Sequence, residues 1–61
     1  MKLEIIARHG PEKLAFRGSR LVWLKRYATG LQTWRSADIT RGAATQRILD
    51  QWNAFTGQRV R

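Results

Sequence analysis

The sequence of 61 residues contains no cysteine and a single histidine, His9. The absence of cysteine excludes disulfide bridges, cysteine-ligated zinc and iron–sulfur clusters, and one histidine does not build a metal site by itself. We therefore expect no cofactor. A chain this short buries only about 60% of the surface that its unfolded form exposes. Its stability must come from an aromatic core or from association, and a homodimer is one such arrangement.

Long apolar runs are absent as well. The longest uninterrupted one, Leu21–Leu24, is far shorter than the roughly 20 residues that a membrane span requires. The first residues are too charged, and their apolar stretch too short, for a signal peptide. We expect one domain over 1–57, a frayed basic tail over 58–61, no membrane partner and a cytoplasmic location.

Acidic residues are scarce: four Asp and Glu stand against twelve Lys and Arg, which gives a net charge of +8. Most of the basic residues are arginine, whose planar guanidinium suits phosphate and stacks on bases. A charge this high on a small domain attracts polyanions. The alternative, that the charge only aids solubility, is weaker because acidic residues serve that purpose better. The balance favours a nucleic acid, or an acidic or nucleic-acid-binding protein, as partner.

Groupings of residues that catalysis needs are also missing, since there is no glycine-rich phosphate loop and no second histidine. His9, Glu12 and Ser19 could be combined into a nucleophile set, but a lone histidine beside a Gly-Pro turn is typical of a turn residue. A domain of this size has little room for a pocket that excludes water. We expect a protein that is not an enzyme.

Alternation of apolar and polar residues predicts strands over 2–9, 14–17 and 31–35. Turn signals separate them at His9–Glu12 and Gly18–Ser19. The residues expected to share a face are Leu3, Ile5 and Ala7 (with Ile6 as an exception) in the first strand, Leu14 and Phe16 in the second, and Gln32 and Trp34 in the third.

Residues 20–29 fit two interpretations. As a strand, Leu21, Trp23 and Tyr27 share one face, with Val22 and Leu24 behind them. As a helix, the segment would be capped by Ser19 and stopped by Gly30. The β-branched and aromatic content favours the strand.

A C-terminal helix is predicted to begin at 40–42 and to end before Gly57. At 100° per residue, Ala44, Ile48, Trp52 and Phe55 form one apolar stripe, so we expect Trp52 and Phe55 in the core. The predicted fold class is α+β: a small antiparallel sheet of three or four strands with one C-terminal amphipathic helix packed on it.

Basic residues interleaved with aromatic ones are typical of surfaces that bind single-stranded nucleic acid, where the charges meet the backbone and the rings stack on bases. Trp34 and Tyr27 each lie among polar residues, and the sequence leaves open whether they are core or contact residues. The candidate residues for binding nucleic acid or an acidic partner are Arg8, Arg17, Arg20, Lys25, Arg26, Tyr27, Trp34, Arg35, Arg41 and Arg47.

The predicted start of the helix, 40–45, offers free backbone N–H groups beside Arg41, and helix N-termini attract phosphate. Capping of the helix by Thr40 or Asp38 is the simpler explanation of these residues.

The runs Tyr27–Leu31 and Thr45–Ile48 together resemble a loose group of very small phage-encoded proteins. Those proteins carry a Tyr-x-Thr-x-aliphatic strand, a hairpin and a Thr-x-basic helix start; the resemblance covers about 21–52. The hairpin here is shorter, and no histidine follows Arg47. The resemblance implies a phage or mobile-element setting. The predicted architecture alone is similar to the arm-binding domains of tyrosine integrases, whose sheet enters a DNA groove.

These observations predict non-enzymatic binding of nucleic acid by arginines on an open sheet face and at the helix N-terminus. The alternative is a phage-encoded inhibitor of a host machine such as a polymerase, nuclease or CRISPR effector, with Trp34 and Arg35 as a binding hot spot. A third hypothesis is a subunit of a larger basic assembly. Duplex DNA, single-stranded DNA and RNA all remain open as ligands.

Overall fold

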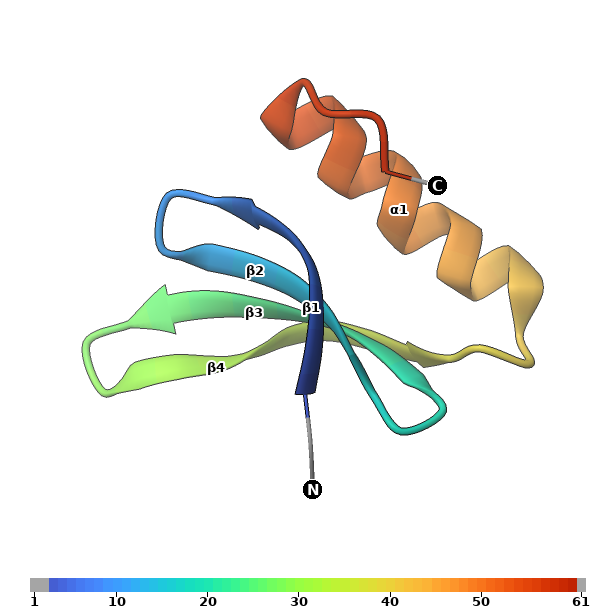
Figure 1. Cartoon of the computed structure of the whole chain (residues 1–61), viewed down its shortest axis with the longest axis horizontal. Coiled ribbons are helices and arrows are strands. Elements are labelled where there is room, and N and C mark those ends of the chain that lie inside the picture. The colour runs from blue at the N-terminus through green and yellow to red at the C-terminus, as the bar shows by residue number, and fades with distance from the viewer. Residues whose placement is uncertain (1–2, 61) are drawn as a thin grey trace.

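The computed structural model describes residues 3–60, which form four strands and one helix. The elements are β1 (Leu3–His9), β2 (Glu12–Arg17), β3 (Arg20–Tyr27), β4 (Gly30–Asp38) and α1 (Gly42–Thr56). The strands form one antiparallel sheet in the order β1-β2-β3-β4, and α1 lies across one side of it (Figure 1). The predicted fold class is confirmed, as is the strand over most of 20–29. Lys2, which we placed in the first strand, lies outside the described residues.

Tight turns join the strands and set their register. Gly10 and Gly18 open two-residue turns, each with a φ of 60°, which is the conformation that a type II′ hairpin requires at its first central position. The third hairpin turns at Ala28 and Thr29 and ends on Gly30, whose φ of 116° would strain any other residue. The strands therefore lie beside their sequence neighbours, and most sheet contacts are local.

An irregularity in β1 changes which of its residues face the helix. Ile5 lies opposite Ala15 but Ala7 lies opposite Leu14, so Ile6 is an extra residue between two paired positions. Ile6 and Ala7 pack on the helix side, whereas Ile5 packs on the other side against Val22 and its neighbours. The prediction that Leu3, Ile5 and Ala7 share a face is therefore wrong, because an extra residue shifts the alternation by one step.

The main core lies between the sheet and α1. Its buried members are Leu14, Leu21, Trp23, Ala37, Ile48, Leu49 and Trp52. Trp52 is fully buried, and its ring meets that of Trp23 nearly edge-on, with 5.1 Å between centroids. Both indole N–H groups find acceptors: Trp52 Nε1 donates to Gln58 Oε1 at 3.0 Å and Trp23 Nε1 to Glu12 Oε1 at 3.2 Å. Buried indoles need such partners.

Phe55 does not join this core, although we expected it to. Its side chain is 55% exposed, and its ring pairs with those of His9, at 5.3 Å between centroids, and Trp23, at 5.9 Å. The reason is its position in the last turn of α1, one turn beyond Trp52, where it meets the rim of the core. The placement of Trp52 in the core is confirmed.

The segment after the helix is held against the protein. Gly57 ends α1 with a φ of 76° and donates its N–H to Asn53 O at 2.8 Å, as expected for a residue that terminates a helix. Val60 then exchanges two hydrogen bonds with the Asn53 side chain, at 2.9 and 2.8 Å, and packs on the core. Gln58 Nε2 donates to Arg8 O at 2.7 Å.

The expectation of a frayed tail over 58–61 is therefore wrong for 58–60, and Arg61 lies outside the described residues. The physical reason is that the Val60 side chain packs on the core, while the Asn53 amide satisfies the backbone N–H and C=O of Val60. Within residues 3–60, α1 is the only helix, and it is too short and too polar to cross a bilayer.

Replacing Trp52 by alanine should unfold the protein. Truncating a buried aromatic residue costs about 3–5 kcal/mol, which is a large share of the roughly 3–9 kcal/mol available to a domain of this size. Phe55→Ala is the matched control, since its ring is half exposed and its loss should cost under about 1 kcal/mol. Urea denaturation followed by circular dichroism measures both, and equal midpoints for the two variants would contradict this account of the core.

Candidate nucleic-acid interface

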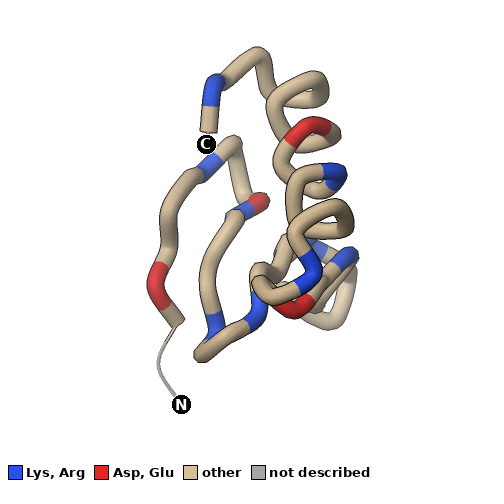
Figure 2. The backbone as a smooth tube through the Cα atoms, turned by 90° about the vertical axis from the view of Figure 1, so that its right-hand side faces the viewer, with Lys and Arg blue, Asp and Glu red and all other residues tan. Residues whose placement is uncertain are grey.

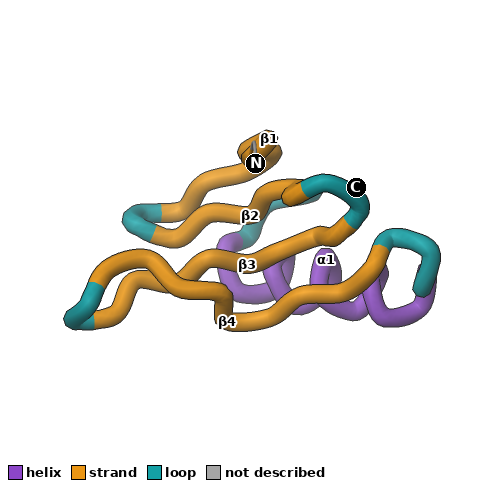
Figure 3. Tube along the Cα trace, turned by 90° about the horizontal axis from the view of Figure 1, so that it is seen from below, coloured by secondary structure: helices purple, strands orange, loops and turns teal. Residues whose placement is uncertain are grey.

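The predicted contact residues separate onto two opposite sides of the sheet. Residues that lie directly opposite each other on neighbouring strands point to the same side. Lys13 lies opposite Leu24 and Arg8 opposite Lys13, and Arg17 lies opposite Arg20. All of these share the side that faces away from α1, which we call the open face. Figure 3 shows the sheet with α1 behind it and no other helix or loop of residues 3–60 in front.

The open face has an apolar middle bordered by two basic rows. The middle consists of Ile5, Ala15, Val22 and Leu24, of which the last three are buried. One row holds Arg17 and Arg20 and the other holds Arg8 and Lys13. The rows lie at Lys13 and Arg17, four residue steps apart along β2, which corresponds to about 13 Å at the usual rise of a strand. Arg26 adds a fifth cation on the same face, opposite Leu31.

Both basic rows place like charges directly across from each other. Such pairs destabilise a sheet. Arg20 is held in place on this face, since its Nη2 donates to Ser36 Oγ at 3.0 Å. The side chains of Arg8, Arg17 and Arg20 are all exposed, so the repulsion is screened by solvent and available for relief by a bound anion.

Asp38 lies opposite Arg20 and is committed to the turn that leads into α1. Its Oδ1 accepts hydrogen bonds from Thr40 N at 3.0 Å and Thr40 Oγ1 at 2.8 Å. These two bonds, the backbone one first, hold the pKa of the Asp38 carboxyl below its usual value; slight burial opposes them, and nearby Arg20 and Arg41 add smaller contributions in the same direction.

The helix itself begins at Gly42, as predicted, but no side chain caps it. Asp38 and Thr40 bond to each other, and Thr45 Oγ1 donates back to the backbone oxygen of Asp38 at 3.2 Å. The expectation that Asp38 or Thr40 caps the helix is therefore wrong. The N-cap position is occupied by Arg41, and the Asp38 carboxylate accepts from Thr40 before the helix begins.

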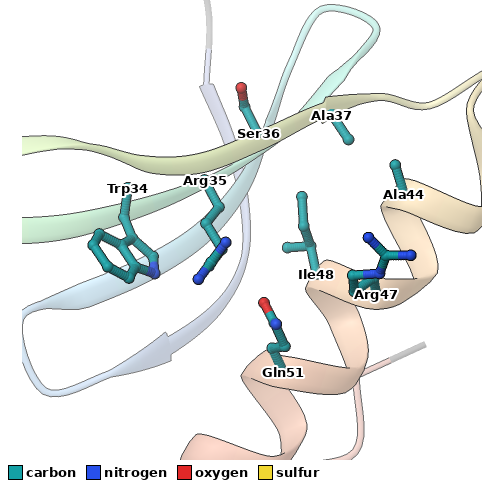
Figure 4. Close-up of a pocket in the computed structure, with 8 residues that line it drawn as sticks. All are labelled: Trp34, Arg35, Ser36, Ala37, Ala44, Arg47, Ile48 and Gln51. Atoms are coloured by element: carbon teal, nitrogen blue, oxygen red, sulfur yellow. The ribbon is translucent and has the colours of Figure 1, made fainter.

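On the other side of the sheet, an extra residue in β4 brings Trp34 and Arg35 together. Arg35 lies opposite Trp23 and Thr33 lies opposite Leu24, which leaves Trp34 without a partner. Such a bulge turns two consecutive side chains to one side, and Figure 4 shows both of them on the side of the strand that faces α1. Strict alternation, which puts Gln32 and Trp34 on one face, would place Arg35 on the opposite face from Trp34.

Trp34 and Arg35 line a groove between β4 and α1, which we call the β4–α1 groove. It comprises two adjoining hollows of about 280 and 210 Å³ that share Trp34, Arg35 and Gln51. Ser36, Ala37, Ala44, Arg47 and Ile48 complete the first hollow, and Glu12, Trp23, Lys25 and Phe55 complete the second. Each hollow lies below the range of about 300–1,000 Å³ typical of pockets for drug-sized ligands, so each suits a small group.

The ring of Trp34 is 42% exposed and carries two cations. Lys25 Nζ lies 4.3 Å from the centroid of the ring, and the guanidinium carbon of Arg35 lies 5.0 Å from it. At an exposed site such a contact contributes about 0.5–1 kcal/mol. Trp34 is therefore a surface residue, and so is Tyr27, which is 40% exposed.

The ten predicted contact residues thus fall into three sets. Four lie on the open face (Arg8, Arg17, Arg20 and Arg26) and four line the β4–α1 groove (Lys25, Trp34, Arg35 and Arg47). Tyr27, in the last position of β3, and Arg41, just before α1, line neither hollow.

Sequence reasoning missed three residues of these surfaces. Lys13 follows the same alternation as Ala15 and Arg17 and was overlooked because the predicted strand began one residue later. Gln51 lies one helical turn after Arg47, which is the signal that could have found it. Phe55 was assigned to the core.

Comparison with known proteins identifies no relative: the chain matches no protein-family description, no curated protein and no solved structure. The site is therefore interpreted from its own chemistry. Figure 2 shows more basic than acidic positions along the backbone, most of them in the strands and the segments beside them.

The stability that Asp38 supplies should be lost in acid. Its folded-state pKa lies below the value of 3.8 for a free side chain, so the ionised carboxylate stabilises the folded protein, and this contribution is full above that value and disappears as the pH falls through the folded-state pKa. The advantage in unfolding free energy of the native protein over Asp38→Asn should therefore shrink below about pH 4. Urea denaturation at a series of pH values measures it; an advantage that persists unchanged to about pH 2 would contradict the assignment.

Proposed function

We propose that this protein binds nucleic acid through the open face, with Arg8, Lys13, Arg17, Arg20 and Arg26 as contacts to phosphate. The observation that carries the proposal is the pair of like-charged rows, with exposed arginines, on the face of the sheet that α1 does not cover. Arginine and lysine held in repulsion gain twice from a bound phosphate, once from the direct attraction and once from relief of that repulsion.

The spacing of the rows favours a polymer over a small anion. About 13 Å along the strands separates them, so a ligand that satisfies both must carry several phosphates. Nucleic acid provides them at short, regular intervals. Ala15, Val22 and Leu24 between the rows are buried, so contacts on this face fall to the charged side chains, which suits phosphate and not a reading of base edges.

Solubility explains the same charge less well. A role in solubility needs cations that are spread out, whereas the rows place them opposite each other at a cost in stability. An acidic protein surface could also meet five cations, and the experiment below separates that possibility from nucleic acid.

Removing one basic row should weaken binding and flatten its salt dependence. We expect Arg17→Gln/Arg20→Gln to lower the slope of log K against log salt by about 1.8 for duplex DNA, because each neutralised phosphate contributes about 0.9. Arg59→Gln changes the charge at an exposed position of the C-terminal segment that belongs to neither surface; singly, it should leave the slope unchanged. Fluorescence anisotropy between about 50 and 200 mM salt measures the slopes.

The same titrations decide against the proposal if the double variant loses only twice as much affinity and slope as the control, since the effect for each charge removed would then be equal and binding would depend only on net charge. Weak binding of every nucleic acid that vanishes at the higher salt would instead assign the basic surface to an acidic protein partner.

A further inference from the structure

Trp34 is the most exposed of the three tryptophans, and it lies on the side of the sheet that the proposed phosphate contacts do not occupy. Trp23 and Trp52 are 5% and 0% exposed, whereas Trp34 is 42% exposed. The bulge in β4 directs it to the β4–α1 groove together with Arg35. A bulge that aims an aromatic ring at a hollow is a feature found beside binding sites.

The groove combines cations with flat apolar surface. Lys25, Arg35 and Arg47 line it, and Glu12 is the one acid among the residues that do so. Glu12 already accepts the N–H of Trp23 at 3.2 Å. Ala37, Ala44 and Ile48 give the first hollow its apolar lining, and Figure 4 shows Gln51 on α1 facing the β4 side chains.

We infer that the β4–α1 groove binds an unpaired nucleotide of a single-stranded nucleic acid, with the base stacked on Trp34 and its flanking phosphates bound by Lys25, Arg35 and Arg47. The inference rests on the proposed function, because both surfaces would take the same class of polymer. It adds a second site, on the opposite side of the sheet, that recognises bases as well as charge.

Two cations occupy the Trp34 ring in the free protein, and a base that stacks on the ring would replace them there. Lys25 and Arg35 lie over the indole, and neither contact involves a carboxylate. A phosphate offers each cation a charged hydrogen bond, which is stronger than an exposed cation–π contact. A base offers the ring a stacking partner in return. Binding exchanges two weak contacts for stronger ones without any movement of the backbone.

The size and the walls of the groove agree with a base. Hollows of about 280 and 210 Å³ suit one small planar group each. Phe55, 55% exposed, lines the second hollow and gives it another aromatic surface. Gln51, which is shared by both hollows, carries an amide that can donate to and accept from a base edge. A flexible acidic peptide would use the three cations but would leave both rings without stacking partners.

The test compares a labelled single-stranded oligothymidylate of about ten nucleotides with an abasic oligonucleotide of the same length and charge. For the native protein we expect the thymidylate to bind at least about fivefold more tightly. Trp34→Leu, which keeps apolar area but removes the aromatic face, should abolish that difference and leave the abasic affinity unchanged. Trp34→Phe should retain most of it, and circular dichroism confirms that each variant is folded.

Three results would overturn the inference. One is equal binding of the two oligonucleotides by the native protein. The second is an equal loss of affinity for both in Trp34→Leu, and the third is a polyglutamate peptide that competes as well as thymidylate. The double variant of Arg17 and Arg20 separates this inference from the proposed function: if it still flattens the salt dependence for duplex DNA while Trp34→Leu has no effect, the open-face proposal stands and the groove assignment fails.

Discussion

The edge-to-face contact between Trp23 and Trp52 holds the helix on the sheet. Their ring centroids lie 5.1 Å apart, and each ring is buried with its N–H satisfied by a neighbour, Glu12 for one and Gln58 for the other. Gln58, which accepts the N–H of Trp52, also donates its side-chain amide to the backbone oxygen of Arg8 and so anchors the C-terminal segment. A chain of 61 residues without cysteine has few other means to order its ends, so one aromatic contact joins three parts of the molecule.

The bulge at Trp34 is the second constraint, and it decides what the helix side of the sheet presents. Ala37 lies opposite Leu21 and is buried in the main core. If β4 paired without the extra residue, its alternation would slip by one step and Ser36 would take the place of Ala37 in the core. The sheet absorbs the extra residue at Trp34 and thereby places an indole and a guanidinium side by side at the groove. Packing of the core and composition of the groove are thus two consequences of one irregularity.

Charge is distributed so that neither surface undermines the fold. The cross-strand pairs Arg8–Lys13 and Arg17–Arg20 lie on the face away from the main core, where water screens their repulsion. Two cations of the groove, Lys25 and Arg35, lie over the ring of Trp34. The two surfaces lie on opposite sides of one sheet, and each can be altered by substitution without touching the other.

Sequence by itself determined the net charge, the turns at Gly10 and Gly18 and the C-terminal helix with Trp52 in the core, because these follow from local conformational preference and from the period of apolar residues. It favoured the β3 strand but left a helix open there. Tertiary structure decided which face of the sheet the helix covers, and so which arginines share a surface. It also decided that Phe55 stays at the rim and that residues 58–60 return to the core. Alternation along a strand assigns residues only to the same face or to opposite faces, and each bulge reverses that assignment for the residues beyond it. A bulge forms through pairing with a neighbouring strand, so the pattern of a single segment does not reveal it.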